Sequence, residues 1–424
     1  MVEHNFIKKT EKKKPINKKK IALKVTIFVC AAVLFGAIAA VVFCQMLKGF
    51  AAQNDEDQVS LDDYKEAIAA ELDDNDDSGS SADVEESVDE DGNVTRIVEV
   101  PEELDLRDYT KLYRQMAKVS RKTKKSIVTV TGISEDTDWF NNSHENKNQV
   151  TGMIVAENSK DLFIVTESRG VSDAERIRLT FVDGESVDAE MQKADPVSGL
   201  CVLKVSLGDM NSDTLSKIKT AEFGSMSTTN QGDPVIFLGN SLGYDDTVTF
   251  GELTSNNNTL TLYDAEYTLL TTNIQGNKKS SGVLLDIEGS VVGIAVQPLV
   301  SSSRVVSFIS ITELTDLIEN LSNNKSLLYT GIKGEAVTKE INEETGIPIG
   351  VYINEVESDS PAMLAGCKNG DVITKFNDKK VKSMKQYVTA LNQCSVGDEV
   401  TLTLMREGVN GYSELTFDVT IGSL

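Results

Sequence analysis

Histidine and cysteine, the residues that most often bind zinc, are scarce in this sequence. It has two histidines, His4 and His144, and five cysteines that do not form short-spaced pairs. A tetrahedral zinc site needs a set of four such ligands, which these residues do not supply. The sequence also lacks a GxxxxGKS or GxxxxGKT loop, the pattern that cradles nucleotide phosphates. We therefore expect no cofactor and no metal.

The cysteines outside the most apolar stretch of the chain are Cys201, Cys367 and Cys394. Three is an odd number, and their spacing does not suggest a disulfide framework. We expect them to be small buried hydrophobic residues, and a Cys367–Cys394 disulfide is the alternative.

Charge is distributed unevenly along the chain. The formal net charge is −24, yet the first 24 residues contain nine lysines and only two acidic residues, Glu3 and Glu11. The remainder is therefore strongly acidic and unsuited to nucleic acid, because phosphates are neutralised by a basic face.

An uncharged apolar run follows this basic tail at residues 25–47. As a helix it would span about 34 Å, enough for a hydrocarbon core of ~30 Å. The run is longer than the apolar core of a cleaved signal and ends in Gln-Met-Leu-Lys, so we expect a retained transmembrane helix. The positive-inside rule then predicts a cytoplasmic tail at residues 1–24 and an extracytoplasmic location for everything after Lys48.

Residues 48–105 are dominated by Asp, Glu, Ser and Gly, and within residues 54–105 the only basic residues are Lys65 and Arg96. Such a composition buries too little apolar surface to offset its ordering entropy. We expect a disordered, self-repelling linker.

The pattern beyond residue 105 predicts a folded, mainly β region. Residues 106–125 have the spacing of an amphipathic helix, and eleven short apolar runs with turn residues between them follow, up to a second predicted helix at residues 311–322. Many short strands at roughly even spacing are typical of sandwiches and barrels. About 200 residues with this many strands fit a pair of antiparallel barrels.

Five segments of this region, in order, resemble the trypsin-like protease domain of the HtrA family. They are SIVTVTG at residues 126–132, GMIV at 152–155, DGESVDAEMQKADPVSGLCVLKV at 183–205, QGDPVIFLGNSLGYDDTVTFGELTS at 231–255, and TTNIQGNKKSSGVLLDIEGSVVGIAV at 271–296. The resemblance implies a trypsin-like double β-barrel over residues 106–325.

The resemblance also implies where a catalytic triad would lie. A serine protease needs a serine, a histidine that takes its proton and an aspartate that orients the histidine. The family's histidine aligns with Arg169, its aspartate with Gly199 and its nucleophile with Ser280, or with Ser281 after a one-residue slip. Arginine stays protonated and cannot act as the base. We therefore predict an inactive protease fold.

Two departures flank the aligned serine. Lys278 and Lys279 replace a Gly-Asn pair of the family, which puts the oxyanion hole in doubt. They also permit a Ser–Lys dyad as the alternative, if burial lowered the pKa of a lysine. His144 lies in the polar stretch NNSHENKNQ, where we expect a loop residue rather than a relocated base.

Residues 326–424 resemble a PDZ domain of the kind that follows the HtrA protease domain. The loop Tyr329-Thr330-Gly331-Ile332 takes the place of the family's carboxylate-binding loop, whose main-chain amides capture a peptide C-terminus. The run GVYINEVESDSPAMLAGCKNGDVITKFNDKKV at residues 350–381 continues the match.

The other wall of the peptide groove is predicted to be a helix at residues 383–393. Met384, Val388 and Leu391 fall on one face at i, i+4 and i+7. We expect this face to line the groove, with Met384 favouring an apolar ligand side chain. The alternative is that Val388 and Leu391 pack the domain core.

Together these patterns predict a membrane-anchored, extracytoplasmic HtrA-like pseudoprotease whose PDZ domain binds C-terminal or unfolded protein segments in cell-envelope quality control or regulation. The first rival is an active envelope endopeptidase that degrades misfolded proteins with an unusual base. The second is an oligomer scaffold, since the family tends to form homotrimers.

Overall fold

The computed structural model describes residues 58–62, 64–65, 86–88, 94–96, 106–137, 143–225, 229–242, 246–300 and 304–424. The chain divides into two compact units, Met1–Gln58 and Val59–Leu424, and the second carries the barrels and the C-terminal domain. The predicted tail and transmembrane helix, with His4, lie outside the described residues. Among the residues that are described, no helix is long and apolar enough to cross a membrane.

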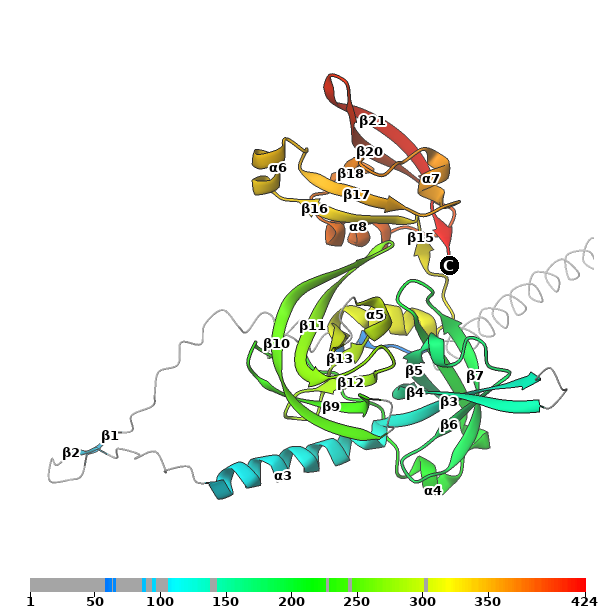
Figure 1. The fold of residues 1–424 in the computed structure, drawn as a ribbon, viewed down its shortest axis with the longest axis vertical. Coiled ribbons are helices and arrows are strands. Elements are labelled where there is room, and N and C mark those ends of the chain that lie inside the picture. The colour runs from blue at the N-terminus through cyan, green and yellow to red at the C-terminus, as the bar shows by residue number, and fades with distance from the viewer. Residues whose placement is uncertain are drawn as a thin grey trace, which may run out of the picture. The chain divides into compact units, whose positions relative to one another are not determined.

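Six antiparallel strands close the first barrel in the order β3-β4-β5-β8-β7-β6 (Figure 1). Their bounds are Ile127–Thr137, Ser143–Glu157, Asp161–Glu167, Leu200–Ser206, Ser186–Ala194 and Arg176–Thr180 in that order. Strand β5 is buried on both faces. Leu162 and Ile164 fill the barrel core, whereas Phe163 and Val165 join the cluster shared with the second barrel. Since successive side chains of a strand alternate sides, one apolar run supplies both clusters.

A second closed barrel has the strand order β10-β11-β14-β13-β12-β9. These strands span Thr247–Leu262, Ala265–Gln275, Val305–Ser310, Val291–Ala295, Ser281–Leu285 and Pro234–Asn240 in that order. Every residue of β12 and β13 is buried. The long strands β10 and β11 form a hairpin whose register pairs Leu262 with Ala265. Only Tyr263 and Asp264 connect the two strands, so this turn is tight.

Helix α5 (Ile311–Ser322) has the bounds predicted for it and buries Ile311, Leu314, Ile318 and Leu321. These residues join the cluster between the two barrels. Helix α3 (Leu106–Thr123) precedes the first barrel, and the short helix α4 (Ser212–Leu215) lies between the two barrels in the sequence. The 3₁₀ turns η2, η3, η4 and η6 span Lys124–Ser126, Ser168–Gly170, Leu207–Asp209 and Gln297–Leu299.

The C-terminal region forms a small α+β domain with a separate core. Its main sheet has the order β16-β17-β18-β20-β21, with β19 paired to β18, and β15 pairs with β22. The strands β15 to β22 are Leu328–Tyr329, Ile332–Val337, Gly350–Val356, Val372–Phe376, Lys379–Lys380, Glu399–Gly408, Gly411–Thr420 and Gly422–Ser423. Helices α6, α7 and α8 span Lys339–Thr345, Pro361–Ala365 and Met384–Leu391. The predicted mainly β fold, with two barrels and a small α+β domain, is confirmed.

The three cysteines outside the apolar segment are free thiols, so Cys367 and Cys394 do not form the alternative disulfide. Cys201 and Cys367 are buried, as expected of small hydrophobic residues. Burial, aided by the nearby carboxylate of Asp371, raises the pKa of Cys367 to about 12.

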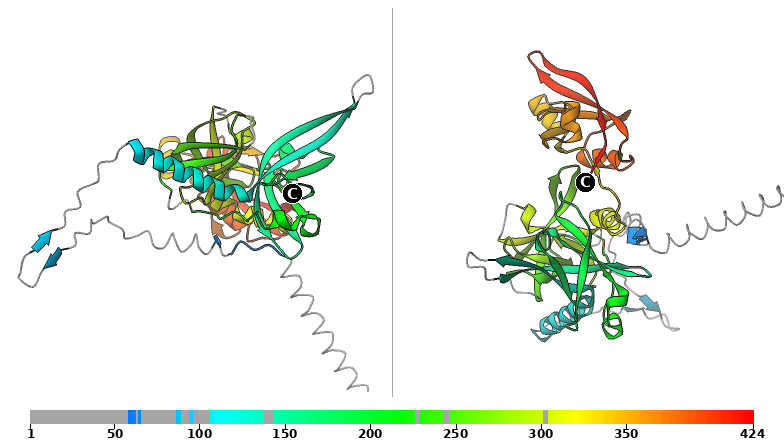
Figure 2. Two further views of the ribbon diagram at one scale, coloured as in Figure 1. Left: turned by 90° about the horizontal axis from the view of Figure 1, so that it is seen from below. Right: turned by 90° about the vertical axis from the view of Figure 1, so that its right-hand side faces the viewer.

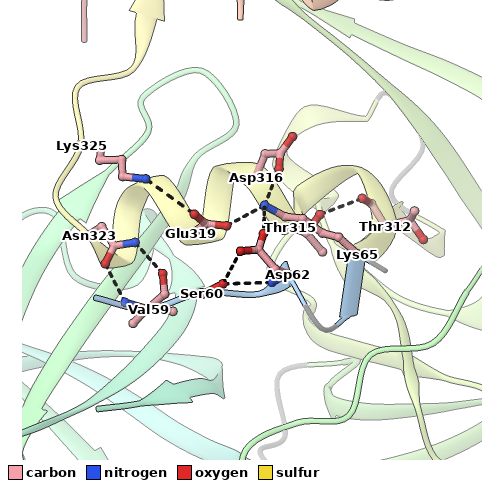
Figure 3. Close-up of polar contacts among 10 residues, drawn as sticks. All are labelled: Val59, Ser60, Asp62, Lys65, Thr312, Thr315, Asp316, Glu319, Asn323 and Lys325. Carbon is pink, nitrogen blue, oxygen red and sulfur yellow. Dashed lines mark hydrogen bonds and ion pairs between the residues drawn. The ribbon is translucent and has the colours of Figure 1, made fainter. Parts of the chain in front are cut away.

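Part of the predicted disordered linker is ordered, which corrects that prediction. A docking segment, residues 59–62 and 64–65, lies against α5 (Figure 3). Asn323 donates from Nδ2 to the Val59 carbonyl at 2.7 Å and accepts the Val59 N–H at 2.8 Å. Leu61 and Val59 are buried, and the Lys65 ammonium lies 2.6 Å from Glu319 and 2.8 Å from Asp316. The acidic composition of the stretch did not reveal that its apolar residues Val59 and Leu61 pack against the folded domain.

Two further strands lie within the same acidic stretch. They are β1 (Glu86–Val88) and β2 (Val94–Arg96), which pair antiparallel as a two-stranded sheet. The prediction of a uniformly unstructured linker is wrong here as well.

His144 was expected in a loop, but the structure places it on strand β4, which is a correction. Its register partner is Asp136, because the β3–β4 ladder continues out to the pair Thr137 and Ser143. Figure 2 shows this hairpin extending from the barrel.

Candidate active site and carboxylate-binding loop

Ser280, the residue aligned with a nucleophile, lies in the loop between β11 and β12 and is fully buried. Its Oγ donates a hydrogen bond to the main-chain carbonyl of Ser241. The same oxygen accepts a bond from the Asn277 N–H at 2.8 Å. In this geometry the hydroxyl hydrogen of Ser280 points to a carbonyl oxygen, whereas an activated serine hydrogen-bonds to a base.

The main-chain amides beside Ser280 are also engaged. In an acyl-transfer site, such amides point at the oxyanion position. Here the Ser280 N–H donates to the Asn277 carbonyl at 3.0 Å, and the Lys279 N–H donates to Asn277 Oδ1 at 2.7 Å. Asn277 thus accepts hydrogen bonds from both of these main-chain amides within the loop. Sequence reasoning missed this residue, although asparagine commonly bonds to main-chain amides two residues on.

Ser281, the alternative nucleophile, is equally buried. Its Oγ accepts the Thr151 N–H at 3.0 Å and lies 3.4 Å from the Thr151 hydroxyl. Lys278 and Lys279, the candidate bases of a dyad, are both exposed to solvent. A Ser–Lys dyad requires a lysine that is buried, and neither of these side chains is.

Arg169 lies beside this serine loop, as the alignment of a histidine position implies. It sits in the turn η3, and its Nη2 donates to the carbonyl oxygens of Lys279 at 3.0 Å and Ser280 at 3.2 Å. Its Nε donates to Glu167 Oε2 at 2.5 Å. A guanidinium has five donors and no acceptor, so Arg169 can clamp the loop but cannot accept a proton from it.

Glu167 is a second residue that sequence reasoning missed. It is buried, and burial raises the pKa of its carboxyl group, whereas the hydrogen bond and positive charge of Arg169 oppose the rise. Its Oε1 has no hydrogen-bond partner among the described residues. Burial and the nearby Glu167 together raise the pKa of Cys201 to about 12. An ion pair between the half-buried Arg169 and the buried Glu167 therefore stands where the family's histidine aligns.

Gly199 occupies the position of the family's aspartate. Its φ is +71°, a left-handed conformation, and no atom lies within 4 Å of where a Cβ would be. Its carbonyl oxygen accepts bonds from the Ser168 N–H at 2.8 Å and the Ser168 hydroxyl at 3.0 Å. Gly199 therefore positions the start of η3, and no carboxylate supports that turn from this position.

Within the described ranges, no group of three His, Cys, Asp or Glu residues is arranged to hold a metal ion.

The predicted carboxylate-binding loop leads from β15 to β16. Gly331 has φ +82°, and a Cβ there would lie 2.3 Å from the Cβ of Ser360. The position therefore requires glycine for both its conformation and its packing. The N–H groups of Thr330, Gly331 and Ile332 converge on one point, which is the arrangement that captures a carboxylate.

A carboxylate already occupies that point, and it belongs to Asp264 at the tip of the β10–β11 hairpin. Asp264 Oδ2 accepts the N–H groups of Thr330 at 2.7 Å and Gly331 at 2.6 Å, and Oδ1 accepts that of Ile332 at 3.3 Å. The Thr330 hydroxyl also bonds to Asp264. Burial raises the pKa of Asp264, and these four hydrogen bonds oppose the rise. This pairing could not be predicted from the sequence.

Helix α8 forms the other side of the groove. Met384 and Leu391 are fully buried in the core of the domain, while Val388 is half-buried and lines a cavity of about 730 Å³ that Asp264 also lines. Tyr387, which sequence reasoning missed, is buried with its hydroxyl 2.6 Å from the Thr330 hydroxyl. The assignment of Met384 as a ligand contact stays a prediction, because its side chain is covered in this conformation.

Comparisons with known proteins agree with both parts of this geometry. The trypsin-like peptidase domain family matches residues 150–294, and the PDZ domain family matches residues 309–421. The serine protease Do-like HtrB of Bacillus subtilis is 30% identical over 280 residues, covering 61% of this chain and 59% of HtrB. The chain is thus similar to HtrA-family proteases in both its trypsin-like part and its PDZ part.

Solved HtrA structures share the fold at low sequence identity. The HtrA-type protease AlgW with a decapeptide has a TM-score of 0.55 and 18% identity, covering 73% of this chain and 98% of AlgW. A probable periplasmic serine endoprotease, DegP-like, from Halomonas elongata is 28% identical over 274 residues, 63% of this chain and 55% of the relative. The chain thus spans less than two thirds of the length of these curated relatives.

Proposed function

We propose that this HtrA-like chain is a pseudoprotease that works by binding rather than by cleaving. One observation carries the proposal: the Ser280 hydroxyl donates its hydrogen bond to the Ser241 carbonyl instead of to a base. The occupied amides of the loop and the Arg169 clamp support the same conclusion. In mutated triads, loss of the histidine alone lowers kcat by roughly 10⁶.

The binding function is assigned to the PDZ loop, with protein C-termini or unfolded segments as ligands. The three convergent N–H groups of Thr330, Gly331 and Ile332 already hold a carboxylate, which supports that ligand chemistry. Solved HtrA-type structures of AlgW contain a decapeptide or a tripeptide. We propose a role in quality control or regulation at the cell envelope.

Location outside the cytoplasm, with one N-terminal membrane helix, belongs to the same proposal. The names of relatives from Halomonas elongata and Chlamydia trachomatis describe periplasmic endoproteases, which supports an extracytoplasmic site. The apolar run at residues 25–47, preceded by lysines, supports a retained anchor. Alkaline extraction of membranes tests this part: the full chain should remain in the pellet, and release into the supernatant would reject the anchor.

Assembly into homotrimers is a further part of the proposal. Helix α3 exposes Leu106, Tyr109, Leu112 and Tyr113, an apolar face suited to contact with another copy. Light scattering in detergent should give three times the monomer mass, and a monomer mass would reject the trimer.

The rival function is peptidase activity towards misfolded proteins, which the names of the relatives describe for those proteins. Degradation of casein that is abolished by Ser280→Ala would favour this rival. Casein that survives equally with the parent chain and with the variant would favour binding.

Peptide binding is tested on an array of decapeptides, each made with a free C-terminal carboxylate and with a C-terminal amide. We expect binding that requires the free carboxylate and is lost in Gly331→Trp, with circular dichroism to verify folding. Equal signals from the carboxylate and amide forms, with or without Gly331→Trp, would contradict the proposed ligand class.

A further inference from the structure

The turn that carries Asp264 is built to project this one carboxylate. Strands β10 and β11 are joined only by Tyr263 and Asp264, and Asp264 has a left-handed backbone with φ +51°. Aspartate tolerates that conformation better than most residues that have a Cβ. The tight turn leaves the Asp264 side chain at the end of a long hairpin.

Asp264 also reproduces the main-chain contact of a bound peptide. Its N–H donates to the Ile332 carbonyl at 2.8 Å, while its carboxylate accepts hydrogen bonds from the three N–H groups of the loop. Within the described part of the chain, strand β16, which begins at Ile332, is an edge strand that pairs in its sheet with β17 alone. A peptide that adds to this edge would need the same carbonyl and the same amides. Asp264 and a peptide C-terminus therefore cannot occupy the loop together.

Contacts beside the turn hold the helix on the other side of the groove. The carboxylate of Glu266 of β11 lies near Lys385 of α8, whose positive charge opposes the rise that burial causes in the pKa of Glu266. The Lys385 ammonium lies 3.5 Å from Glu313 of α5, and Glu313 accepts the Thr268 hydroxyl at 3.0 Å. The hairpin thus contacts both walls of the groove, β16 and α8.

We propose that Asp264 is an internal ligand that closes the PDZ loop, so that an incoming C-terminal peptide binds only by displacing it. This inference rests on the proposed function, because the competing ligand is the same class of carboxylate. An internal ligand competes at an effective concentration in the millimolar range for a short connection. Loss of the Asp264 charge should therefore tighten peptide binding about tenfold or more, since charge-assisted hydrogen bonds to the loop are lost.

The first experiment needs no peptide. Amide hydrogen exchange of the full chain in detergent is compared with that of Asp264→Asn, which keeps the shape and removes the charge. We expect exchange at Thr330, Gly331 and Ile332 to rise at least about tenfold in the variant. Asp378→Asn, which changes an exposed carboxylate in the β18–β19 turn, is the matched control and should leave these amides unchanged. Unchanged exchange in Asp264→Asn would overturn the inference.

The second experiment measures the Kd of a fluorescein-labelled decapeptide that ends in valine, with a free carboxylate or a C-terminal amide. We expect Asp264→Asn to bind the carboxylate form at least about tenfold more tightly than the parent or Asp378→Asn. Equal binding by all three chains would overturn the internal ligand and leave the proposed function intact. No binding by any chain, together with faster exchange in Asp264→Asn, would reject the proposed function and support the occupied loop.

Discussion

Arg169 donates from Nη2 to the main-chain carbonyl oxygen of Ser280 at 3.2 Å. In an active serine protease, the residue at the position of Arg169 accepts a proton from the serine hydroxyl. Here the Arg169 guanidinium bonds to the main chain of Ser280, and the Ser280 hydroxyl donates to the Ser241 carbonyl. A structural cation therefore occupies the position aligned with the family's histidine, and its effects can be measured.

Replacing Arg169 with alanine should destabilise the fold. The variant leaves the buried Glu167 carboxylate without its partner, a loss of about 3 kcal/mol in the free energy of unfolding. Arg178→Ala is the control, because its ion pair with Asp188 is exposed and should contribute less than about 1 kcal/mol. Urea denaturation of both variants measures the difference. Equal values would show that the Arg169–Glu167 pair does not stabilise the site.

Glu167 should make the stability of the chain depend on pH. Because its pKa is raised on folding, the folded chain binds this proton more tightly than the unfolded chain does. Its contribution is present at low pH and is lost as the pH rises through the raised value. From pH 5 to 8, the free energy of unfolding should therefore fall more steeply for the parent than for Glu167→Gln. Parallel curves for the two proteins would contradict this assignment.

Restoring the triad should not restore activity. In Arg169→His/Gly199→Asp, the Ser280 hydroxyl and N–H would still be engaged by Ser241 and Asn277. We expect no peptide or ester hydrolysis above the level given by the same variant with Ser280→Ala. Hydrolysis that depends on Ser280 would show that the loop rearranges freely and that Asn277 does not lock it.

The docking segment should detach without unfolding the barrels. Leu61→Ser places a hydroxyl in a buried apolar site of a short segment whose other apolar contacts come from Val59 and Tyr64. We expect proteolysis near residue 61 to become about tenfold faster, with little change in Tm, because local opening costs less than global unfolding. Ser60→Ala, which changes an exposed side chain bonded only to Asp62, should behave like the parent. A large drop in Tm for Leu61→Ser would show instead that the segment is integral to the core.

The fold could be predicted largely from local patterns. The apolar runs of β5, β12 and β13 have the continuous character of strands buried on both faces, and α5 has the spacing of its buried Ile311, Leu314 and Ile318. The docking segment was missed because averaging over an acidic stretch hides isolated apolar residues such as Leu61.

The positions of the candidate site followed from the alignment, but their interactions did not. The bond between Ser280 and Ser241 joins residues 39 positions apart, and the bond between Asp264 and Gly331 joins residues 67 positions apart. Such contacts depend on how two barrels and a separate sheet come together, which no local periodicity encodes. The role of Asn277 could more easily have been predicted, since its side chain forms a hydrogen bond within its own turn.

Labelling with a fluorophosphonate probe, which reacts covalently with an activated serine, tests the central claim most directly. The full chain is compared with Ser280→Ala and Ser281→Ala, and an active trypsin-like protease verifies the probe. Because the Ser280 hydroxyl donates its hydrogen bond to the Ser241 carbonyl, the parent chain should remain unlabelled, as should both variants. Labelling of the parent that disappears in Ser280→Ala or Ser281→Ala would contradict the account and establish an active serine.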